Sequence, residues 1–401
     1  MKKTRRVFAF LLVLCAPLLL LSSAPAENKV APKGQYLAYV GTYTTKTNSK
    51  GIYVFRYDAA TGKLSSLGLA AESADPSFVA VHPNGQFLYA VNESGKSSTV
   101  SAFHIDFATG KLTLLNQLPA LGEDPCYISF DRSGKYVFVA NYTSGNVVVF
   151  PVGADGKLGA ATANVRDEGI LGPNKERQEA PHAHWIEQEE TNRTVYVADL
   201  GLDCVLSYQF DVTNGTLSNA LVHSNWAPTV KPKDPSAKLV RGTGPRHAVF
   251  SSDGMRMYVL GELKSTVTAF HMVGTDLFTP TSFQRISALP KKFSGRNDAA
   301  EIAIHPSGKF LYTSNRGNDT IAVFNVQRRG GTLKLLDNVP TGGKEPRHFA
   351  IDPSGKYLLA ENQFSNNIVV FKIDPGTGGL TPTGQVVEAP SPVDLTFVAA
   401  E

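Results

Sequence analysis

Short apolar runs alternate with polar turns along most of the chain, and one arrangement of them returns six times. Each copy opens with an apolar stretch, turns through a polar segment that contains glycine in five of the six copies, and returns through an apolar stretch rich in Tyr, Val and Phe. Two apolar stretches joined by a glycine turn predict a β-hairpin. The copies begin at Pro76, Pro125, Pro181, Pro245, Ala299 and Pro346.

A third apolar run follows each hairpin, and a second turn leads from it to a fourth run. Residues 51–58 and 146–151 are examples of the third run, and residues 61–64 (TGKL) form one of the second turns. The copies start 49, 56, 64, 54 and 47 residues apart, with no helical periodicity between them. Four antiparallel strands in a repeat of about 50 residues predict the blades of a β-propeller.

The two ends of the repeat region complement each other. Residues 36–44 have the pattern of a second strand without a first, whereas residues 391–399 have that of a first strand without a second. Pairing them assembles a seventh blade and removes the free edges that an open sheet exposes. We therefore predict an all-β fold over residues 36–401, a single seven-bladed propeller with four antiparallel strands per blade whose terminal segments share one blade.

The segment before the repeats has a different character. Residues 1–26 combine a basic start, a 15-residue apolar run from Val7 to Leu21 and the small residues of 24–26. This is the pattern of a secretory signal peptide, and its apolar run is shorter than the roughly 20 residues that cross a bilayer. We expect a signal peptide over 1–26, a linker over 27–35, no membrane span, and export to the periplasm or the extracellular medium.

The net charge of the chain belongs to that same segment. The whole chain has 39 Lys and Arg against 35 Asp and Glu, and residues 1–26 hold four of the basic residues and none of the acidic ones. The mature chain is therefore neutral, whereas a nucleic-acid-binding surface needs an excess of basic residues. With 42% hydrophobic and 18% charged residues the composition is globular, and we expect no nucleic-acid partner.

Familiar cofactor and metal signatures are not evident. The chain has no Gly-x-Ser-x-Gly elbow, no complete P-loop and no complete glycine motif for a dinucleotide. His182 and His184 lie two residues apart on one strand face and suit a metal, but no third ligand at fixed spacing accompanies them. Cys126 and Cys204 match no zinc pattern, and the sequence leaves their oxidation state open. We expect neither a metal nor an organic cofactor.

Aligning the repeats shows which positions vary at the end of the second strand. The first residue there is mostly Asn, Asp or Gly, which suits a turn with left-handed backbone. The second residue varies freely, as functional positions on a repeated scaffold do. The aligned pairs are Gly41-Thr42, Asn92-Glu93, Asn141-Tyr142, Asp199-Leu200, Gly261-Glu262, Asn315-Arg316 and Asn362-Gln363.

The first strand of each blade should line the central channel, and charged residues gather near its start. The residue after the opening Pro, or its counterpart, is Ser77, Cys126, His182, Arg246, Ala300, Arg347 or Val393. Further titratable residues close by are His184, His247, Glu301, His348 and Asp394. Buried charge is costly unless it is paired or used to hold a ligand. The cluster is therefore either a ring of ion pairs between blades or a functional site.

Several short motifs in this order resemble a known family. YVGTYT at the start, APHAH, DLGLD, GTGPRH, GEL, SNRG and EPRHF together resemble the seven-bladed lactonase family. That family includes bacterial 6-phosphogluconolactonase and fungal 3-carboxy-cis,cis-muconate cyclase, and it acts without a cofactor. The resemblance implies His182, Arg246, Glu262 and Arg316 as catalytic residues. We expect substrate contacts from His184, His247, Glu301 and Arg347.

The resemblance implies a hydrolase that opens a small anionic lactone of a sugar or an organic acid. Arg246 and Arg316 would hold an anionic group or stabilise the oxyanion, and either Glu262 or His182 would take the proton from water. Two alternatives stay open: lactonising or cycloisomerase activity of the muconate type, and a non-catalytic propeller that binds a ligand or partner protein. We expect a monomer.

Overall fold

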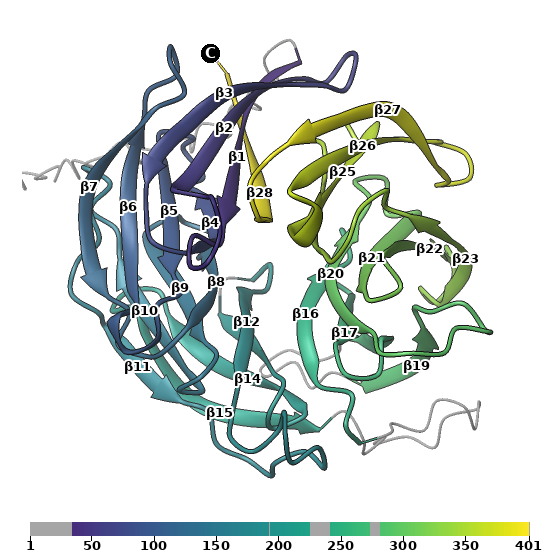
Figure 1. Ribbon diagram of the computed structural model, residues 1–401. Coiled ribbons are helices and arrows are strands. Elements are labelled where there is room, and N and C mark those ends of the chain that lie inside the picture. Colours follow the sequence, from purple (N-terminus) through teal and green to yellow (C-terminus); the bar gives the residue numbers. More distant parts are fainter. Residues whose placement is uncertain (1–33, 192, 225–240, 273–280, 401) are drawn as a thin grey trace, which may run out of the picture. The chain divides into compact units, whose positions relative to one another are not determined.

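The computed structural model describes residues 34–400, apart from residue 192 and segments 225–240 and 273–280. The predicted signal peptide over 1–26 and most of the predicted linker over 27–35 lie outside the described residues. The described part of the chain forms seven antiparallel sheets of four strands each, arranged as the blades of one ring (Figure 1). The predicted seven-bladed propeller is confirmed.

Each blade runs from an inner strand at the channel to an outer strand at the rim. Blades 1 to 6 are β4–β7, β8–β11, β12–β15, β16–β19, β20–β23 and β24–β27, and blade 7 is β28 with β1–β3. The inner strands are β4 (Pro76–Val81), β8 (Pro125–Phe130), β12 (Ala183–Gln188), β16 (Pro245–Phe250), β20 (Asp298–Ile304), β24 (Pro346–Ile351) and β28 (Pro392–Ala399). The second strands are β5 (Phe87–Asn92), β9 (Tyr136–Asn141), β13 (Thr194–Asp199), β17 (Arg256–Gly261), β21 (Phe310–Arg316), β25 (Tyr357–Asn362) and β1 (Gln35–Thr42).

The two outward strands complete each blade. The third strands are β6 (Thr99–Ile105), β10 (Asn146–Pro151), β14 (Cys204–Asp211), β18 (Thr266–His271), β22 (Thr320–Val326), β26 (Asn367–Ile373) and β2 (Gly51–Asp58). The outer strands are β7 (Leu112–Pro119), β11 (Ala163–Arg166), β15 (Thr216–Ser224), β19 (Thr281–Ser287), β23 (Leu333–Pro340), β27 (Leu380–Glu388) and β3 (Lys63–Glu72). Two short 3-10 turns, η1 (Gly95–Ser97) and η3 (Gln363–Ser365), follow β5 and β25.

The hydrophobic core lies between neighbouring blades. Every residue of β5, β9 and β25 is buried, because a second strand packs against other blades on both faces. In the outer strands β23 and β27 only the first residue is buried, and the others are exposed or partly exposed at the rim. Tyrosines tie several blades to the next: Tyr39 donates to the carbonyl of Gly110 and Tyr89 to that of Gly156. The glycine turns that the sequence predicted between third and fourth strands thus anchor the neighbouring blade.

Strands from the two ends of the described chain close the ring. β28 pairs with β1 from Tyr36 opposite Ala399 to Thr42 opposite Pro392, and the two strands lie side by side in Figure 1. The carboxylate of Asp394 on β28 also accepts the backbone N–H of Val79 in blade 1 at 2.7 Å. Blade 7 is therefore held to the blade that follows it by a buried polar contact as well as by packing.

A bulge near the start of each inner strand corrects the predicted alignment. In blades 1, 2, 4 and 6 the opening Pro pairs with the last residue of the second strand and the next residue is skipped. In blade 3 Ala183 takes the place of that Pro and His184 is the skipped residue. In blade 7 Thr42, and not Gly41, faces Pro392. His184 is therefore the counterpart of Arg246, and Tyr43 is the counterpart of Glu262.

The asparagines that end several second strands have a structural role, but not the turn role that the sequence predicted. The side-chain amides of Asn92, Asn141, Asn315 and Asn362 donate to backbone carbonyls of the loop before the inner strand, namely those of Ala74, Ala120, Ala288 and Thr341. None of these asparagines has a positive φ; the left-handed residues include Asp75, Asp124, Glu345 and Ser391, just before the inner strands. These asparagines therefore fix the loop before the inner strand of their blade by side-chain hydrogen bonds and do not themselves adopt the left-handed turn conformation.

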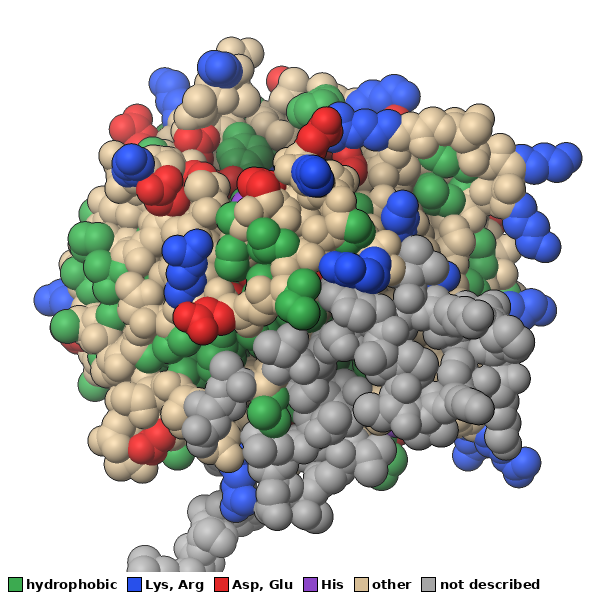
Figure 2. Space-filling model, turned by 90° about the horizontal axis from the view of Figure 1, so that it is seen from below, with side chains coloured by type: hydrophobic (Ala, Val, Ile, Leu, Met, Phe, Trp, Pro, Cys, Tyr) green, Lys and Arg blue, Asp and Glu red, His purple; other side chains and the backbone are tan. Residues whose placement is uncertain are grey.

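The surface carries charges of both signs. On the face shown in Figure 2, Lys and Arg side chains are scattered singly among acidic and neutral ones and do not form one basic patch. Within the described residues, no helix has the length and hydropathy needed to cross a bilayer.

Candidate active site

The loops at one end of the channel surround a cavity of about 270 Å³. Two rings of side chains build it: the residues skipped at the bulges and the residues that end or follow the second strands. Figure 1 places these loops around the centre of the ring. The lining residues are Glu93, Cys126, Tyr142, Arg177, His184, Glu262, Arg316 and Arg347.

Glu262 is the hub of the charges around this cavity. Its Oε1 lies 2.5 Å from Nη2 of Arg177, and its Oε2 lies 3.1 Å from Nε of Arg246 and 2.9 Å from Nη2 of Arg316. Burial alone would raise the pKa of this carboxyl, but the charges of Arg316, Arg246 and Arg177 lower it to about 2. Glu262 is therefore firmly ionised, and three guanidinium groups share its single negative charge.

The arginines on Glu262 are fixed by backbone carbonyls. Arg246 donates from Nη1 to the carbonyl of Ala300, and Arg316 donates from Nε to that of Asp298 at 3.1 Å. Burial and the neighbouring charges of Arg316 and Arg347 lower the pKa of Arg246 to about 10, so it stays charged at neutral pH. Arg316 lines the main cavity, whereas Arg246 lines a narrow continuation beneath it. This cluster carries excess positive charge.

Arg347 forms a second polar group on the opposite side. Its Nη2 donates to Tyr43 Oη at 2.9 Å, and its guanidinium also lies 5.2 Å from the centre of the Tyr43 ring. Tyr43 in turn donates from its hydroxyl to Oε2 of Glu93 at 2.8 Å. Burial raises the pKa of Glu93 above its usual value. The cavity thus has an arginine-rich side around Glu262 and a Tyr–Glu side around Arg347.

The two histidines of the APHAH motif lie in different surroundings. The ring of His182 stacks on Tyr142, with centroids 4.4 Å apart and planes 9° apart. Its Nδ1 donates to the carbonyl of Tyr142, and its Nε2 lies 3.0 Å from Glu179. His182 is not among the residues that line the cavity, whereas His184 is. Burial and the charge of Arg246 hold the pKa of His184 well below its usual value, so its imidazole is neutral.

A charged layer fills the channel beneath the cavity. His348 places Nδ1 2.8 Å from Glu361 and Nε2 3.1 Å from Asp394. Burial would lower the pKa of His348, but Asp394, Glu301 and Glu361 raise it to about 9. His247 lies 2.8 Å from Glu301 through Nδ1, and burial and Arg246 lower its pKa to about 4. His247 and Glu301 border the narrow continuation of about 10 Å³ and not the main cavity.

The structure therefore brings together Arg246, Glu262 and Arg316 from the predicted catalytic set. Of the expected substrate contacts, His184 and Arg347 line the main cavity and His247 and Glu301 lie one layer deeper. Sequence reasoning did not select Tyr43, Glu93, Tyr142 or Arg177. Tyr43, Glu93 and Tyr142 each follow the end of a second strand, and the variation of residue type at that aligned position was the signal that could have identified them. Arg177 lies in the long connection between β11 and β12, outside the strands and turns that the repeat alignment compared.

The thiols and imidazoles show no shared metal arrangement. Cys126 and Cys204 are both buried free thiols, and Cys126 Sγ lies 3.6 Å from Nδ1 of His184. Among the residues that the structure describes, no group of three or more His, Cys, Asp or Glu side chains is placed to hold a metal ion. The groups at hand instead suit recognition of an anion and stabilisation of negative charge by guanidinium groups.

Fold and pocket together define a β-propeller with a guanidinium-rich cavity at one end of its channel. Residues 37–397 match the family described as "Lactonase, 7-bladed beta-propeller", and the chain belongs to that family. The resemblance seen in the motifs is confirmed.

Named relatives agree with this family. A 6-phosphogluconolactonase of Bacillus subtilis (strain 168) is 36% identical, over 91% of this chain and 99% of its own length. A crystal structure of a putative 6-phosphogluconolactonase from Bacteroides fragilis matches with a TM-score of 0.81 and 35% identity, over 94% of this chain and 100% of its own. The periplasmic gluconolactonase PpgL of Pseudomonas aeruginosa matches with a TM-score of 0.79 and 31% identity, over 92% and 100%. The chain is an enzyme of the lactonase class.

Proposed function

We propose that this lactonase opens the ring ester of a sugar lactone by adding water. The observation that carries the proposal is the group of three arginines on one carboxylate, Glu262, which lines the same cavity as the neutral imidazole of His184. The arginine side supplies positive charge where an oxyanion would form. The imidazole can accept a proton.

The ester bond breaks in two steps. Water attacks the lactone carbonyl carbon, its proton passes to His184, and the carbonyl oxygen becomes an oxyanion beside Arg316 and Arg246. When the oxyanion collapses, the bond from the carbonyl carbon to the ring oxygen breaks. The ring oxygen then takes the proton from His184 and becomes a hydroxyl. The product is the open hydroxy acid, which ionises and releases one proton.

His184 suits the role of base better than the two residues first considered. Glu262 has a pKa of about 2, and both of its oxygens are held by arginines, so neither oxygen is free to take a proton from water. The imidazole of His184 is neutral and borders the cavity. His182 is behind the Tyr142 ring and bound to Glu179. In the proposed mechanism Glu262 positions Arg246 and Arg316, and His182 positions the loop that carries Tyr142.

We propose further that the substrate is a sugar lactone and that the enzyme is exported. All three of the compared proteins are named for gluconolactones, one of them as putative and one as periplasmic. Residues 1–26 have the basic, apolar and small-residue pattern of an export signal. The Tyr142 hydroxyl and the Glu93 carboxylate of the cavity suit a polyhydroxy ring, and the arginines suit either its carbonyl oxygen or an attached anion.

A lactone panel followed by proton release tests the reaction. The probes are glucono-1,5-lactone, 6-phosphoglucono-1,5-lactone and a muconolactone, each measured with and without enzyme because lactones also hydrolyse unaided. We expect the sugar lactones to be turned over faster than the muconolactone. Preference for the muconolactone would favour the muconate-type reaction, and no turnover of any probe would favour a ligand-binding propeller.

Replacing His184 and His182 in turn separates the two histidines. His184→Gln should lower kcat by about 10²- to 10⁴-fold, the usual contribution of general acid–base catalysis. His182→Gln should leave kcat within about tenfold of the wild type, because its ring does not reach the cavity. Thermal melting checks that both variants fold. A larger loss of kcat in His182→Gln than in His184→Gln would return the role of base to His182.

A further inference from the structure

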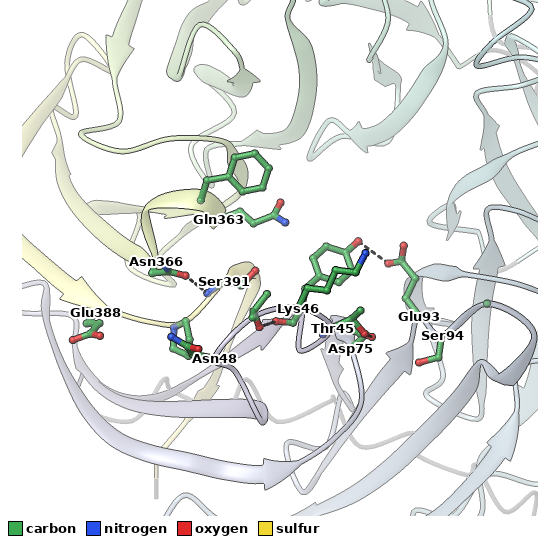
Figure 3. Close-up of a pocket in the computed structure, with 15 residues that line it drawn as sticks. Thr45, Lys46, Asn48, Asp75, Glu93, Ser94, Gln363, Asn366, Glu388 and Ser391 are labelled. Carbon is green, nitrogen blue, oxygen red and sulfur yellow. Dashed lines mark hydrogen bonds between the residues drawn. The ribbon is translucent and has the colours of Figure 1, made fainter.

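A second hollow, much larger than the cavity, opens directly beside it. This groove has a volume of about 1050 Å³ and is formed by the loop after β1, the turn η1 after β5, the turn η3 after β25 and the segment before β28. Figure 3 shows Lys46, Glu93 and Gln363 placed around it from three of these loops. None of the steps of lactone opening uses it.

The groove and the cavity share one boundary. Glu93 lines both, and its hydrogen-bond partner Tyr43 lines the groove and the narrow continuation below the cavity. This boundary lies on the Tyr–Glu side, opposite the arginines bound to Glu262. A lactone ring whose carbonyl faces Arg316 therefore presents its far end to the groove. In a 1,5-lactone the ring atom opposite the carbonyl carbon is C4, so a substituent on C4 would enter the groove.

The side chains of the groove suit a neutral, hydroxylated substituent. Thr45, Asn48, Gln363 and Asn366 offer hydroxyl and amide groups. Three carboxylates, those of Asp75, Glu93 and Glu388, outnumber the single cation of Lys46. This surplus of negative charge opposes a phosphate or carboxylate there.

An exposed aromatic ring at the groove adds an apolar face. Phe364 is 68% exposed, yet its backbone is fixed by two hydrogen bonds. The N–H of Phe364 donates to the carbonyl of Lys344, and the N–H of Gln363 donates to the carbonyl of Glu345. Ligand sites commonly combine aromatic surface with a few placed polar groups. The C–H face of a pyranose ring packs on an aromatic ring while its hydroxyls bind amides and acids.

We propose that the groove is a subsite for a glycosyl group on O4 of the lactone, so that the enzyme's substrates include 4-O-glycosyl aldonolactones. This inference rests on the proposed lactone hydrolysis, because the direction of the substituent follows from the position of the reacting carbonyl. The reaction is unchanged: the ester bond to the ring oxygen breaks, and the glycosidic bond on O4 stays intact.

Three lactones of matched chemistry test the subsite. Glucono-1,5-lactone has no substituent, cellobiono-1,5-lactone carries a glucosyl group on O4, and melibiono-1,5-lactone carries a galactosyl group on O6. We expect kcat/KM for the 4-O-linked lactone to exceed that for the 6-O-linked one by about tenfold, the ratio that one aromatic contact supplies. The assay is proton release with purified full-length protein.

Two variants and a matched control assign the effect to the groove. Phe364→Ala and Asn48→Trp change exposed groove residues and should lower kcat/KM for cellobiono-1,5-lactone by about tenfold, with glucono-1,5-lactone unchanged. Leu114→Ala removes a similarly exposed side chain on outer strand β7 and should change neither rate.

The outcomes separate this inference from the proposed function. Hydrolysis of glucono-1,5-lactone with equal rates for the 4-O- and 6-O-linked lactones, or with no effect of Phe364→Ala and Asn48→Trp, would overturn the subsite and leave lactone hydrolysis standing. Absence of hydrolysis of all three lactones would overturn both.

Discussion

Removing residues 390–401 is expected to abolish cooperative folding. The deletion takes away all of β28 (Pro392–Ala399), the inner strand of blade 7, and exposes the edge of β1 along its whole length. It also removes buried Val393, Leu395 and Val398 from the packing between blades. His348 would lose Asp394, one of the acids around its buried charge. Thermal melting followed by near-ultraviolet circular dichroism should show no sharp transition.

A circular permutant is the matched control for this deletion. Ala399 pairs with Tyr36, so a short linker can join Ala400 to Gln35 without strain. New ends can be opened between Arg329 and Gly330, in an exposed turn between β22 and β23. The permutant keeps every strand and should melt cooperatively. A sharp transition of the truncated chain at the wild-type temperature would show that the β28–β1 seam does not hold the ring closed.

The blades were predictable because their signals are local. The apolar pattern and the glycine turn each depend on a few neighbouring residues. The apolar pattern recurs in every copy and the glycine turn in five of six, so a single irregularity does not hide the repeat. The shared seventh blade followed from the same logic, since residues 36–44 and 391–399 each lacked a partner strand. Closure then needed no information beyond the cost of leaving a strand edge exposed.

The register within a blade was not predictable to the residue. A bulge inserts one residue into the inner strand without changing the apolar pattern that follows it. In blade 3 the Pro181 that marks the repeat stands two residues before Ala183, the residue that pairs with the end of β13. Alignment on Pro therefore placed His182 in the column that His184 occupies. The same one-residue ambiguity in blade 7 made the alignment select Thr42 where the structure has Tyr43.

Arg177 shows a different limit. It reaches Glu262 from the connection between β11 and β12, and such connections differ in length from blade to blade, so comparison among blades gives Arg177 no aligned position. Its side chain is about one-third exposed, and from sequence alone it is one of many surface arginines. The charges around a group in three dimensions also decide its protonation. Glu262 is buried and Glu93 half-buried, and both lie near arginines, yet their pKa values shift in opposite directions.

Glu262→Gln is expected to cost both turnover and stability. The variant keeps the size of the side chain but removes the charge shared by Arg177, Arg246 and Arg316. Breaking a buried ion pair on one side usually destabilises by about 3–5 kcal/mol. Loss of the fixed guanidinium positions at the oxyanion should lower kcat by about 10²- to 10³-fold. Urea unfolding and lactone kinetics on the same preparation measure the two effects.

The free energy of unfolding of the wild type should fall at acid pH as Glu262 is protonated. The pKa of this carboxyl is lowered from 4.5 to about 2 in the folded state, so its ionised form stabilises the fold. That stabilisation is fully present above pH 4.5 and is lost as the pH falls toward 2. The Glu262→Gln variant should lack this part of the acid-induced loss, so the stability difference between the two proteins should shrink between pH 5 and pH 2.

Glu189→Gln separates the catalytic effect from the structural one. Glu189 is also a buried carboxylate, but it lies just after β12, at the end of that strand away from His184, where it accepts hydrogen bonds from Thr191 and Thr194. Its replacement should lower the free energy of unfolding and leave kcat within about threefold of the wild type, because it is far from where the oxyanion forms. If both glutamine variants lost stability and both kept full turnover, Glu262 would be a structural ion-pair hub, and the oxyanion would have to be stabilised without it.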